Sequence, residues 1–556
     1  MENKFVNYLN TLHSYSGHNA NVFGEKNVEN EFYKSMMVEV PLCDFIINEL
    51  TNKAPHIVML TGHAGDGKTS LMFQVLEKMG CTFDNRSDRF EVKTKNGNSV
   101  VCIKDFSEFP DDEKLTLMKE SKEQQDAGKY VFMVANTGPL ITIFSKMFPE
   151  NIQAEMEGKF IDAMDKNSGT TVEIGGYKVC IINIVNVENS YFAPEFIDKV
   201  VNNHEWDKCS NCPKAGYCHI LRNIKLLKDN KTNTIDFISK HYAWLNEYGT
   251  RLTIRNMTQQ LAFMITGGVD CNNIKQHESY MYLYSNLFFG YVGTRIDDMA
   301  QKIYAIGESR KCGYDQKRLR VDETLFIKED FSSVFSKTIV DIINEMQKNN
   351  GNINGLNSLL RRMYFFYNTS IDLARDTEDI FSRQFGRYIE LKNTGAQPTA
   401  KDNDLIKRAL NMIYTGSAKY SNHGIPVTLS RESGYTQNVQ YVIDTLKTNK
   451  IKLISEASDQ FGGYGKKQIR LVIQIDKTKL KQTINLPLLD YFEDLKDGII
   501  NTNIDAQLSK GIENIKSEIL DIVLEDVADD EDFMLIVLGN GEFESVSFTI
   551  SDGRIS

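Results

Sequence analysis

The sequence predicts an α/β fold in which a mainly parallel sheet is flanked by helices. Between residues 54 and 188, short apolar runs alternate with longer mixed stretches. The runs are Ile57–Leu60, Val100–Ile103, Tyr130–Ala135 and Val179–Val187. Such runs are apolar throughout because helices cover both faces of a parallel sheet. A glycine-rich loop and then an amphipathic stretch follow the first run. We therefore expect strands at the four runs and helices between them.

Length and composition narrow the class of protein. The 556 residues should hold three or four domains of about 150 residues each. With 41% hydrophobic and 25% charged residues, the chain resembles an ordinary soluble globular protein. It has no apolar run of about 18 residues and no signal-peptide core, so we expect a cytoplasmic protein with reduced cysteines and no membrane span. The net charge of −11 argues against a general nucleic-acid coat, although a local basic groove stays open.

Changes in composition and in the pattern of apolar residues along the chain predict its domain organisation. The expected segments are a lead-in helix over 1–50, a nucleotide-binding core over 51–248 with a zinc-knuckle insertion at 204–219, a helical lid and helical domain over 249–415, and an α+β module over 416–556. Within the lead-in, Glu29–Leu50 has the apolar spacing of one continuous helix. The α+β module is the candidate for recruiting a partner or DNA.

The stretch Thr61–Ser70, TGHAGDGKTS, carries the strongest functional signal. Gly62, Gly67, Lys68 and Thr69 satisfy the pattern G-x-x-x-x-G-K-[ST], which binds the phosphates of nucleoside triphosphates. Glycines let the backbone curl around a phosphate chain, and the amides of the loop then point at negative charge. Lys68 is expected to reach the β- and γ-phosphates, and the Thr69 hydroxyl to hold Mg²⁺. The expected nucleotide-binding residues are Gly62, His63, Ala64, Gly65, Asp66, Gly67, Lys68, Thr69 and Ser70.

Polar residues follow the next two predicted strands, and the carboxyl ends of strands are where a sheet of this kind gathers its active residues. Asp105 closely follows the second run, and Glu108 lies three residues further on. We expect Asp105 to hold Mg²⁺ and Glu108 to position the attacking water; a plain surface acid is the alternative for Glu108. Asn136 ends the third strand, where the sensor asparagine of AAA-type ATPases orients water near the γ-phosphate. A turn residue before Gly138 is the alternative for Asn136.

A second strong signal is a cluster of cysteines. Cys209, Cys212 and Cys218 follow the spacing C-x2-C-x5-C, with His204 before them and His219 directly after. Thiolates two residues apart across a turn are typical of a zinc knuckle, which needs four ligands. We expect His204 to be the fourth ligand, because it leaves more room for tetrahedral geometry; His219 and a remote cysteine are alternatives. An iron–sulfur cluster or three unrelated thiols would have the same spacing.

Arginines near the predicted lid could sense the γ-phosphate. Arg255 begins a helix that follows Leu252-Thr253-Ile254 and ends at Gly267, and Arg251 is its rival for this role. Either arginine could instead be a solvated helix charge. Arg295 could serve a neighbouring subunit as an arginine finger, and only its residue type supports that role.

The remaining signals concern hairpins and basic or aromatic runs. Turns at Asn96-Gly97 and at Gly539-Asn540-Gly541 predict two antiparallel hairpins. The stretch 447–481 holds nine basic residues against three acids, which indicates a solvated sheet face or, alternatively, a nucleic-acid-binding patch. Aromatic residues around Arg361–Tyr367 are expected to fill the core, with single-strand binding as the minor alternative.

Taken in order, these motifs resemble one family. They are Gly62–Thr69, Asp105–Glu108, Ala135–Leu140, Cys209–Cys218 and Leu252–Arg255. Together they resemble the DptF-type ATPases associated with DNA-phosphorothioation-dependent restriction and, more loosely, other P-loop ATPases of bacterial antiphage defence. The tail around Leu486–Phe492 is also similar, whereas His219 stands where the family usually has a proline. The resemblance implies ATP hydrolysis in the service of a defence complex that has protein subunits as partners and acts on DNA.

The sequence therefore predicts a P-loop NTPase of AAA/STAND-like architecture that uses ATP, Mg²⁺ and Zn²⁺. The expected catalytic residues are Lys68, Glu108, Asn136 and Arg255. GTP in place of ATP, a homo-oligomeric state, and direct against indirect DNA contact are left open. Two other functions are consistent with the same residues: a nucleotide-dependent switch or scaffold that hydrolyses ATP hardly at all, and a nucleic-acid-binding regulator.

Overall fold

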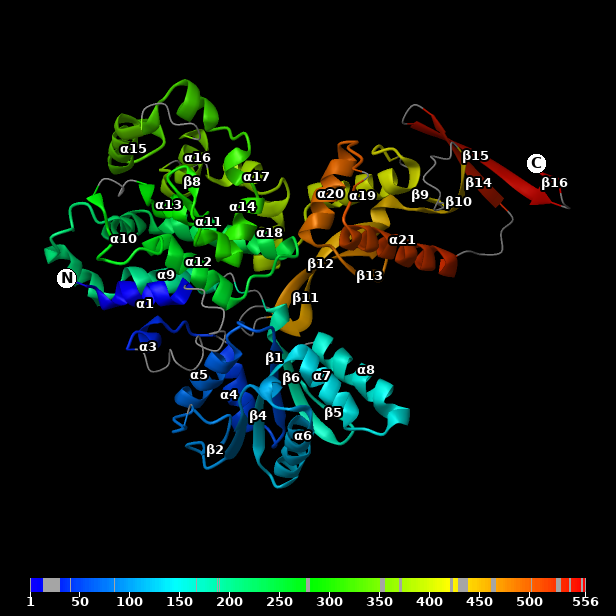
Figure 1. Ribbon diagram of the computed structural model, residues 1–556. Coiled ribbons are helices and arrows are strands. Elements are labelled where there is room, and N and C mark those ends of the chain that lie inside the picture. Colours follow the sequence, from blue (N-terminus) through cyan, green and yellow to red (C-terminus); the bar gives the residue numbers. More distant parts are fainter. Residues whose placement is uncertain are drawn as a thin grey trace. The chain divides into compact units, whose positions relative to one another are not determined.

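The chain forms two compact units in the computed structural model of Figure 1. The structure describes residues 2–13, 31–40, 42–84, 86–166, 168–187, 189, 191–276, 281–350, 356–369, 373–420, 424–428, 439–461, 467–501, 503–526, 532–539, 542–551 and 554–555. The first unit is Met1–Leu373 with Asp459–Lys467, and the second is Ala374–Ser458 with Gln468–Ser556. The boundary expected at residue 415 therefore lies at 373, and the helices between these positions belong to the second unit.

A six-stranded sheet organises the first unit, in the order β2-β3-β4-β1-β6-β5. Its strands are β1 (Ile57–Gly62), β2 (Arg89–Lys93), β3 (Ser99–Ile103), β4 (Tyr130–Asn136), β5 (Thr171–Ile174) and β6 (Tyr177–Asn183). The inner strands β3, β4, β1 and β6 are parallel, whereas β2 and β5 are antiparallel edges. The predicted α/β class and the antiparallel β2–β3 ribbon are thus confirmed. Because β4 lies between β1 and β3, the carboxyl ends of these three strands are neighbours.

The parallel strands are buried on both faces, since their side chains alternate between two cores. The flanking helices are α4 (Leu42–Asn52), α5 (Lys68–Lys78), α6 (Asp111–Asp126), α7 (Thr137–Lys146) and α8 (Glu150–Lys166). Val58 and Leu60 of β1 join the core that includes α4 and α5. Ile57 and Met59 join the opposite core, with α6, α7 and α8 (Figure 1). A shift of one residue in register would exchange these two cores, so packing fixes where each strand ends.

The strand expected over Val179–Val187 is shorter at its carboxyl end, so that prediction was wrong there. β6 ends at Asn183, and a 3₁₀ turn over Ile184–Asn186 follows it. The side-chain oxygen of Asn183 accepts a hydrogen bond from the backbone N–H of Val185 at 3.1 Å. Side-chain capping of this kind offers the backbone a turn in place of further strand pairing.

The continuous helix expected over Glu29–Leu50 was also wrong for the described residues. Helix α3 (Tyr33–Met36) and helix α4 are separated by an extended segment before Pro41. Gln74 of α5 holds that segment, because its amide donates to the carbonyl of Val38 at 2.9 Å and accepts from the N–H of Val40 at 3.2 Å. The residue before a proline is also biased away from the helical conformation.

The rest of the first unit is largely helical. Its main elements are α1 (Lys4–His13), α9 (Phe192–Val201), α10 (His219–Asp229), α11 (Lys231–Glu247), α12 (Ile254–Thr266), α13 (Tyr284–Leu287), β7 (Tyr291–Val292), β8 (Arg295–Ile296), α14 (Tyr304–Lys311), α15 (Lys337–Asn350) and α16 (Leu356–Tyr367). Helix α12 begins at a capping box between Thr253 and Asn256 and ends at Gly267, whose φ of 61° is left-handed, as predicted. Helix α1 packs along α12. The rings of Phe237 and Phe365 stack in the core with centroids 5.1 Å apart, which confirms that these aromatic runs fill the interior.

The second unit is an α+β module. Its helices are α17 (Leu373–Ile380), α18 (Phe385–Thr394), α19 (Ala400–Thr415), α20 (Leu486–Lys496) and α21 (Ala506–Asp526). One sheet has the order β16-β15-β14-β10-β9, from Arg554–Ile555, Glu542–Ser551, Asp532–Gly539, Val439–Leu446 and Ile425–Thr428. The other is β11-β12-β13, from Ile451–Phe461, Lys467–Ile475 and Thr478–Thr483. The predicted final hairpin is β14–β15; the two turn residues Asn540 and Gly541 lie outside the described residues.

Candidate functional site

The glycine-rich loop joins the carboxyl end of β1 to the start of α5. Gly65 and Gly67 have positive φ angles of 90° and 81°, which glycine adopts without strain. A Cβ atom at Gly65 would come within 3.2 Å of the Arg255 Cβ. The backbone N–H of Arg255 donates to the carbonyl of Gly65 at 3.1 Å. The loop is therefore packed directly against the first turn of α12.

Lys68 is the first residue of α5, and its ammonium group turns back into the loop. Its Nζ donates to the carbonyls of Gly62 (3.2 Å) and His63 (2.8 Å) and to Oδ1 of Asn136 (3.0 Å). Burial lowers the pKa of Lys68 to about 8, against the opposing charges of Asp66 and Asp105. A buried ammonium group held by neutral carbonyls is the state that an anionic ligand would stabilise.

Thr69 and Asp105 meet across the ends of α5 and β3. The Thr69 hydroxyl donates to Oδ1 of Asp105 at 3.1 Å. Asp105 has a φ of 50°, in the left-handed region that aspartate tolerates better than most residues. One hydroxyl and one carboxylate at this spacing are the oxygen ligands that Mg²⁺ uses beside a phosphate chain. The structure thus brings the two predicted magnesium ligands together.

Asn136 ends β4, which lies between β1, the strand before the glycine-rich loop, and β3, the strand before Asp105. Its backbone N–H donates to the Ser107 hydroxyl at 2.6 Å, and its side-chain oxygen accepts from Lys68. Gly138 lies in the first turn of α7, so Asn136 precedes a helix and not an isolated turn. Glu108 is exposed on the 3₁₀ turn that follows Asp105.

The two candidate arginines have different environments. Arg251 forms an ion pair with the buried carboxylate of Asp66 at 2.7 Å and also donates to the carbonyl of Ile184 at 2.9 Å. Arg251 therefore links the loop to the segment before α12. Arg255 instead lines the cavity above the loop, which makes it the better-placed of the two for a phosphate.

These groups border one cavity of about 430 Å³. Its charged and polar lining includes Lys68, Thr69, Asp105, Glu108, Asn136 and Arg255. Its apolar lining includes Tyr8, Leu12, Met36, Phe192 and Phe196, and Tyr33 also lines it. The hydroxyls of Tyr33 and Ser70 lie 3.1 Å apart. A lining that holds both charged and apolar side chains suits a nucleotide, which has phosphates and a base.

Some predicted loop residues do not line this cavity. Ala64, Gly65, Gly67 and Ser70 do, whereas Gly62, His63 and Asp66 are not among the lining residues. The Asp66 carboxylate faces its own loop, where it accepts from the N–H of His63 at 2.9 Å. Sequence reasoning missed the apolar residues of α1 and α9, because their spacing is that of any amphipathic helix.

The cysteines gather around a second, smaller cavity of about 50 Å³. It is lined by Cys209, Cys212 and Cys218 and also by Cys271. His204 does not line it: its side chain is 80% exposed and lies 3.4 Å from Glu205. His219 is buried, with Nε2 at 3.1 Å from the Thr266 carbonyl and its ring stacked on Tyr282. His204, the expected fourth ligand, thus lies outside this cavity, whereas the remote cysteine Cys271 lines it.

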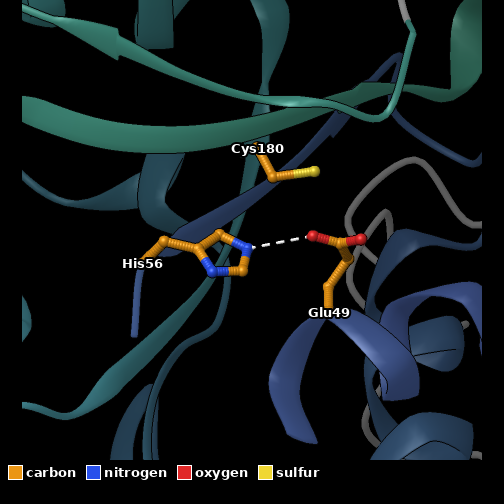
Figure 2. Close-up of side chains that lie close together, drawn as sticks. All are labelled: Glu49, His56 and Cys180. Atoms are coloured by element: carbon orange, nitrogen blue, oxygen red, sulfur yellow. Dashed lines mark ion pairs between the residues drawn. The ribbon is translucent and has the colours of Figure 1, made fainter. Parts of the chain in front are cut away.

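A separate buried cluster lies at the amino end of β1. Figure 2 shows Glu49 of α4, His56 and Cys180 of β6, whose possible ligand atoms all lie within 4.8 Å of one another. Nε2 of His56 is 3.2 Å from a Glu49 oxygen, and Lys53 Nζ is 2.5 Å from the other. Nδ1 of His56 lies 2.8 Å from the carbonyl of Ala54. Because Lys53 already balances the carboxylate, a buried ion pair explains this cluster without a metal, at the opposite end of β1 from the loop.

The other candidate charges are internal or exposed. Arg361 pairs with Asp322 at 2.7 Å, and the buried Arg362 pairs with Asp315, so neither forms a strand-binding surface with the aromatic run. Arg295 is exposed in β8. In the second unit, the basic stretch is partly neutralised, because Glu456 pairs with Arg470 (2.8 Å) and Lys479 (2.5 Å) and Asp476 pairs with Lys450 (3.0 Å).

Comparisons with known proteins identified no similar protein. A scan against protein-family models found no match, and searches of curated proteins and of solved structures found none. Within the described part of the chain, no helix combines the length and the apolar character that a bilayer crossing requires.

Proposed function

We propose that this chain binds and hydrolyses ATP with Mg²⁺ at the loop Thr61–Ser70. The observation that carries the proposal is that one cavity collects side chains from four separate segments of the chain. They are Lys68 and Thr69, Asp105 and Glu108, Asn136, and Arg255. A lysine, a hydroxyl–carboxylate pair, an amide and an arginine would not be expected to gather beside one glycine-rich loop if surface residues were placed at random.

Each side chain has a role that follows from its position. Lys68 would exchange its two loop carbonyls for phosphate oxygens, and Thr69 and Asp105 would hold Mg²⁺. Bound Mg²⁺ supplies charge neutralisation at the phosphates. Asn136, held between Lys68 and Ser107, would orient the attacking water, and Arg255 would bind the γ-phosphate from the side of α12.

The same contacts suggest how nucleotide state could alter the shape of the chain. The loop and α12 share the hydrogen bond between the N–H of Arg255 and the carbonyl of Gly65. Phosphate contacts to Arg255 would add a second connection that exists only while the γ-phosphate is present. Loss of that phosphate would therefore weaken the link between the sheet and α12, as in other switches that sense a γ-phosphate.

The decisive test is ATP turnover by Lys68→Ala. We expect turnover to fall by at least about 100-fold, since the variant lacks the electrostatic contact to the phosphates. Lys78→Ala is the matched control, because Lys78 ends the same helix and its exposed ammonium pairs with Glu39 and Asp44. Turnover by Lys68→Ala equal to that of Lys78→Ala would contradict the proposal.

A second candidate is a nucleotide-dependent switch that hydrolyses ATP hardly at all. The observation in its favour is the exposed position of Glu108, three residues beyond Asp105, with the buried Phe106 between them. Glu108→Gln separates the two functions. In an ATPase it should lower single-turnover hydrolysis by about 10²–10⁴-fold without weakening ATP binding, whereas a slow switch would show the same low rate before and after the change.

We further propose that the ATPase works in a bacterial defence complex with protein partners and with DNA. This rests on the resemblance to DptF-type ATPases and on seven exposed basic residues in the second unit. They are Lys447, Lys450, Lys452, Arg470, Lys477, Lys479 and Lys481. Turnover should rise when DNA is added, and Lys477→Glu with Lys481→Glu should weaken DNA binding and flatten its dependence on salt. Unchanged DNA binding by this double variant would move the contact to another surface or to a partner.

A further inference from the structure

Four cysteines from two distant parts of the chain line one small cavity. Cys209, Cys212 and Cys218 come from the segment between α9 and α10, and Cys271 comes from the turn after α12. Cys209 and Cys212 are joined by a turn in which the N–H of Cys212 donates to the carbonyl of Cys209 at 3.1 Å. Four thiols around a space of about 50 Å³ match the ligand number of a tetrahedral metal site.

Two of the four sulfur atoms accept hydrogen bonds from neighbouring N–H groups. The Asn3 amide donates to Sγ of Cys209 at 3.2 Å, and the N–H of Leu221 donates to Sγ of Cys218 at 3.4 Å. Cys218 is the N-cap of α10, so its sulfur faces the positive end of a helix. Hydrogen bonds of this kind support metal-bound thiolates from outside the ligand shell.

Lys214 joins the two segments and adds a positive charge beside the sulfurs, whereas Lys208 pairs with Glu205 at 2.5 Å. A divalent ion with four thiolates carries a net charge of about −2. Lys208 and Lys214 both line the cavity. Lys214 also donates to the carbonyls of Cys271 (2.9 Å) and Asn272 (2.8 Å), which holds the turn after α12 against the three-cysteine segment.

We propose that Cys209, Cys212, Cys218 and Cys271 bind one zinc ion, with Cys271 as the fourth ligand. In the described residues no three of these sulfurs lie within 4.8 Å of one another. Zinc binding therefore requires the cysteine side chains to turn toward one another by changes of rotamer. The small cavity favours a single ion over an iron–sulfur cluster, which must also enclose bridging sulfides.

The position of the site gives the zinc a specific structural role. Asn3, one residue before α1, bonds to both Cys209 and the carbonyl of Glu205. The metal would thus connect the start of α1 to the end of α12, and α1 carries Tyr8 and Leu12 into the larger cavity. Zinc would hold one wall of that cavity in place. The effect on nucleotide binding rests on the proposed function, whereas the metal site itself does not.

Metal content tests the assignment. Wild-type protein purified under reducing conditions should contain about one zinc per chain, and Cys271→Ser should lose it. Cys312→Ser is the matched control, because Cys312 is also partly buried but lies outside the cavity. Cys271→His should keep the zinc, since imidazole can replace a thiolate, and Asn3→Ala should weaken zinc affinity by about 10–100-fold. Full zinc content in Cys271→Ser would remove Cys271 from the site.

Thiol labelling tests the same proposal on the wild-type chain. It needs no variant, so poor folding of a variant cannot affect the result. With zinc bound, the four ligand cysteines should resist alkylation, and a chelator should expose all four to the reagent together. Cys312 should react equally in both states. Protection of only Cys209, Cys212 and Cys218, or no zinc uptake when Zn²⁺ is added to reduced protein, would overturn the proposal. None of these measurements involves ATP, so they stay informative if the chain has no ATPase activity.

Discussion

Arg251 and Asp66 form an ion pair of 2.7 Å that ties the glycine loop to the segment leading into α12. Both side chains are largely buried: that of Asp66 is 0% exposed and that of Arg251 16%. Four residues further along, Arg255 faces the cavity. Two nearby arginines thus differ in position: Arg251 holds the loop, and Arg255 lines the cavity.

This difference predicts opposite outcomes for two similar substitutions. Arg251→Met leaves the Asp66 carboxylate buried without its partner, so the free energy of unfolding should fall by about 3 kcal/mol. Arg255→Met should change the free energy of unfolding much less but weaken ATP binding or turnover. Denaturant unfolding and ATP titration of both variants check this. Equal losses of stability would contradict the division of roles.

Lys68 should make the ligand-free protein less stable at neutral pH. Burial lowers the pKa of Lys68 from an ordinary 10.5 to about 8. Between pH 8 and pH 10.5 the unfolded chain therefore binds more protons at this lysine than the folded chain does. The stability of the free protein should therefore rise as the pH rises from about 8 to 10.5, by up to about 3 kcal/mol. Lys68→Met should lack this rise. The difference in unfolding free energy between the two proteins, measured against pH without nucleotide, is the test; parallel curves would contradict it.

The contact between Thr69 and Asp105 predicts that the gain in ATP affinity from Mg²⁺ depends on Asp105. Asp105→Asn should remove most of the gain in ATP affinity that Mg²⁺ gives, because a neutral amide is a weaker ligand for the ion. ATP affinity measured without Mg²⁺ should change little. Asp111→Asn is the control, since Asp111 is exposed and pairs with Lys114 and Lys146. An unchanged Mg²⁺ effect in Asp105→Asn would place the ion elsewhere.

The buried pair of Glu49 and His56 should contribute to stability above acidic pH. Burial alone would raise the pKa of Glu49, but hydrogen bonds from His56 and Lys53 outweigh it and hold the pKa below its ordinary 4.5. The contribution is thus present above about pH 4.5 and is lost as the pH falls through the lower, folded-state value.

Glu49→Gln should therefore cost about 3 kcal/mol of unfolding free energy at neutral pH and less at acidic pH. Glu39→Gln, in an exposed ion pair, should change stability by about 0.5 kcal/mol or less. Unfolding at neutral pH with and without a strong chelator also separates the ion pair from a metal site. A chelator that destabilised both the wild type and Cys271→Ser, but not Glu49→Gln, would favour a metal at Glu49.

The sequence was sufficient to predict the sheet and the charged and polar residues that line the cavity. Uniformly apolar strands and a glycine loop are local signals, and the carboxyl ends of parallel strands meet wherever the strands pair. It was not sufficient for residues whose role depends on distant contacts. Cys271 lies 53 residues after Cys218, and only packing of the turn after α12 brings it to the other cysteines. Tyr8 and Phe192 likewise look like ordinary core residues until α1 and α9 are placed.

The antiparallel edges of the six-stranded sheet bear on how copies of this chain could associate. β2 exposes Arg89, Glu91 and Lys93 in alternation, and β5 exposes Glu173. Charged side chains along an outer strand discourage another chain from adding to the sheet, because pairing would bring those charges out of water. Strand addition at either edge is thus disfavoured. Self-assembly of this chain would then favour helices or the second unit as its contact surface, and subunits that separate and rejoin would seldom pair through the edges of this sheet.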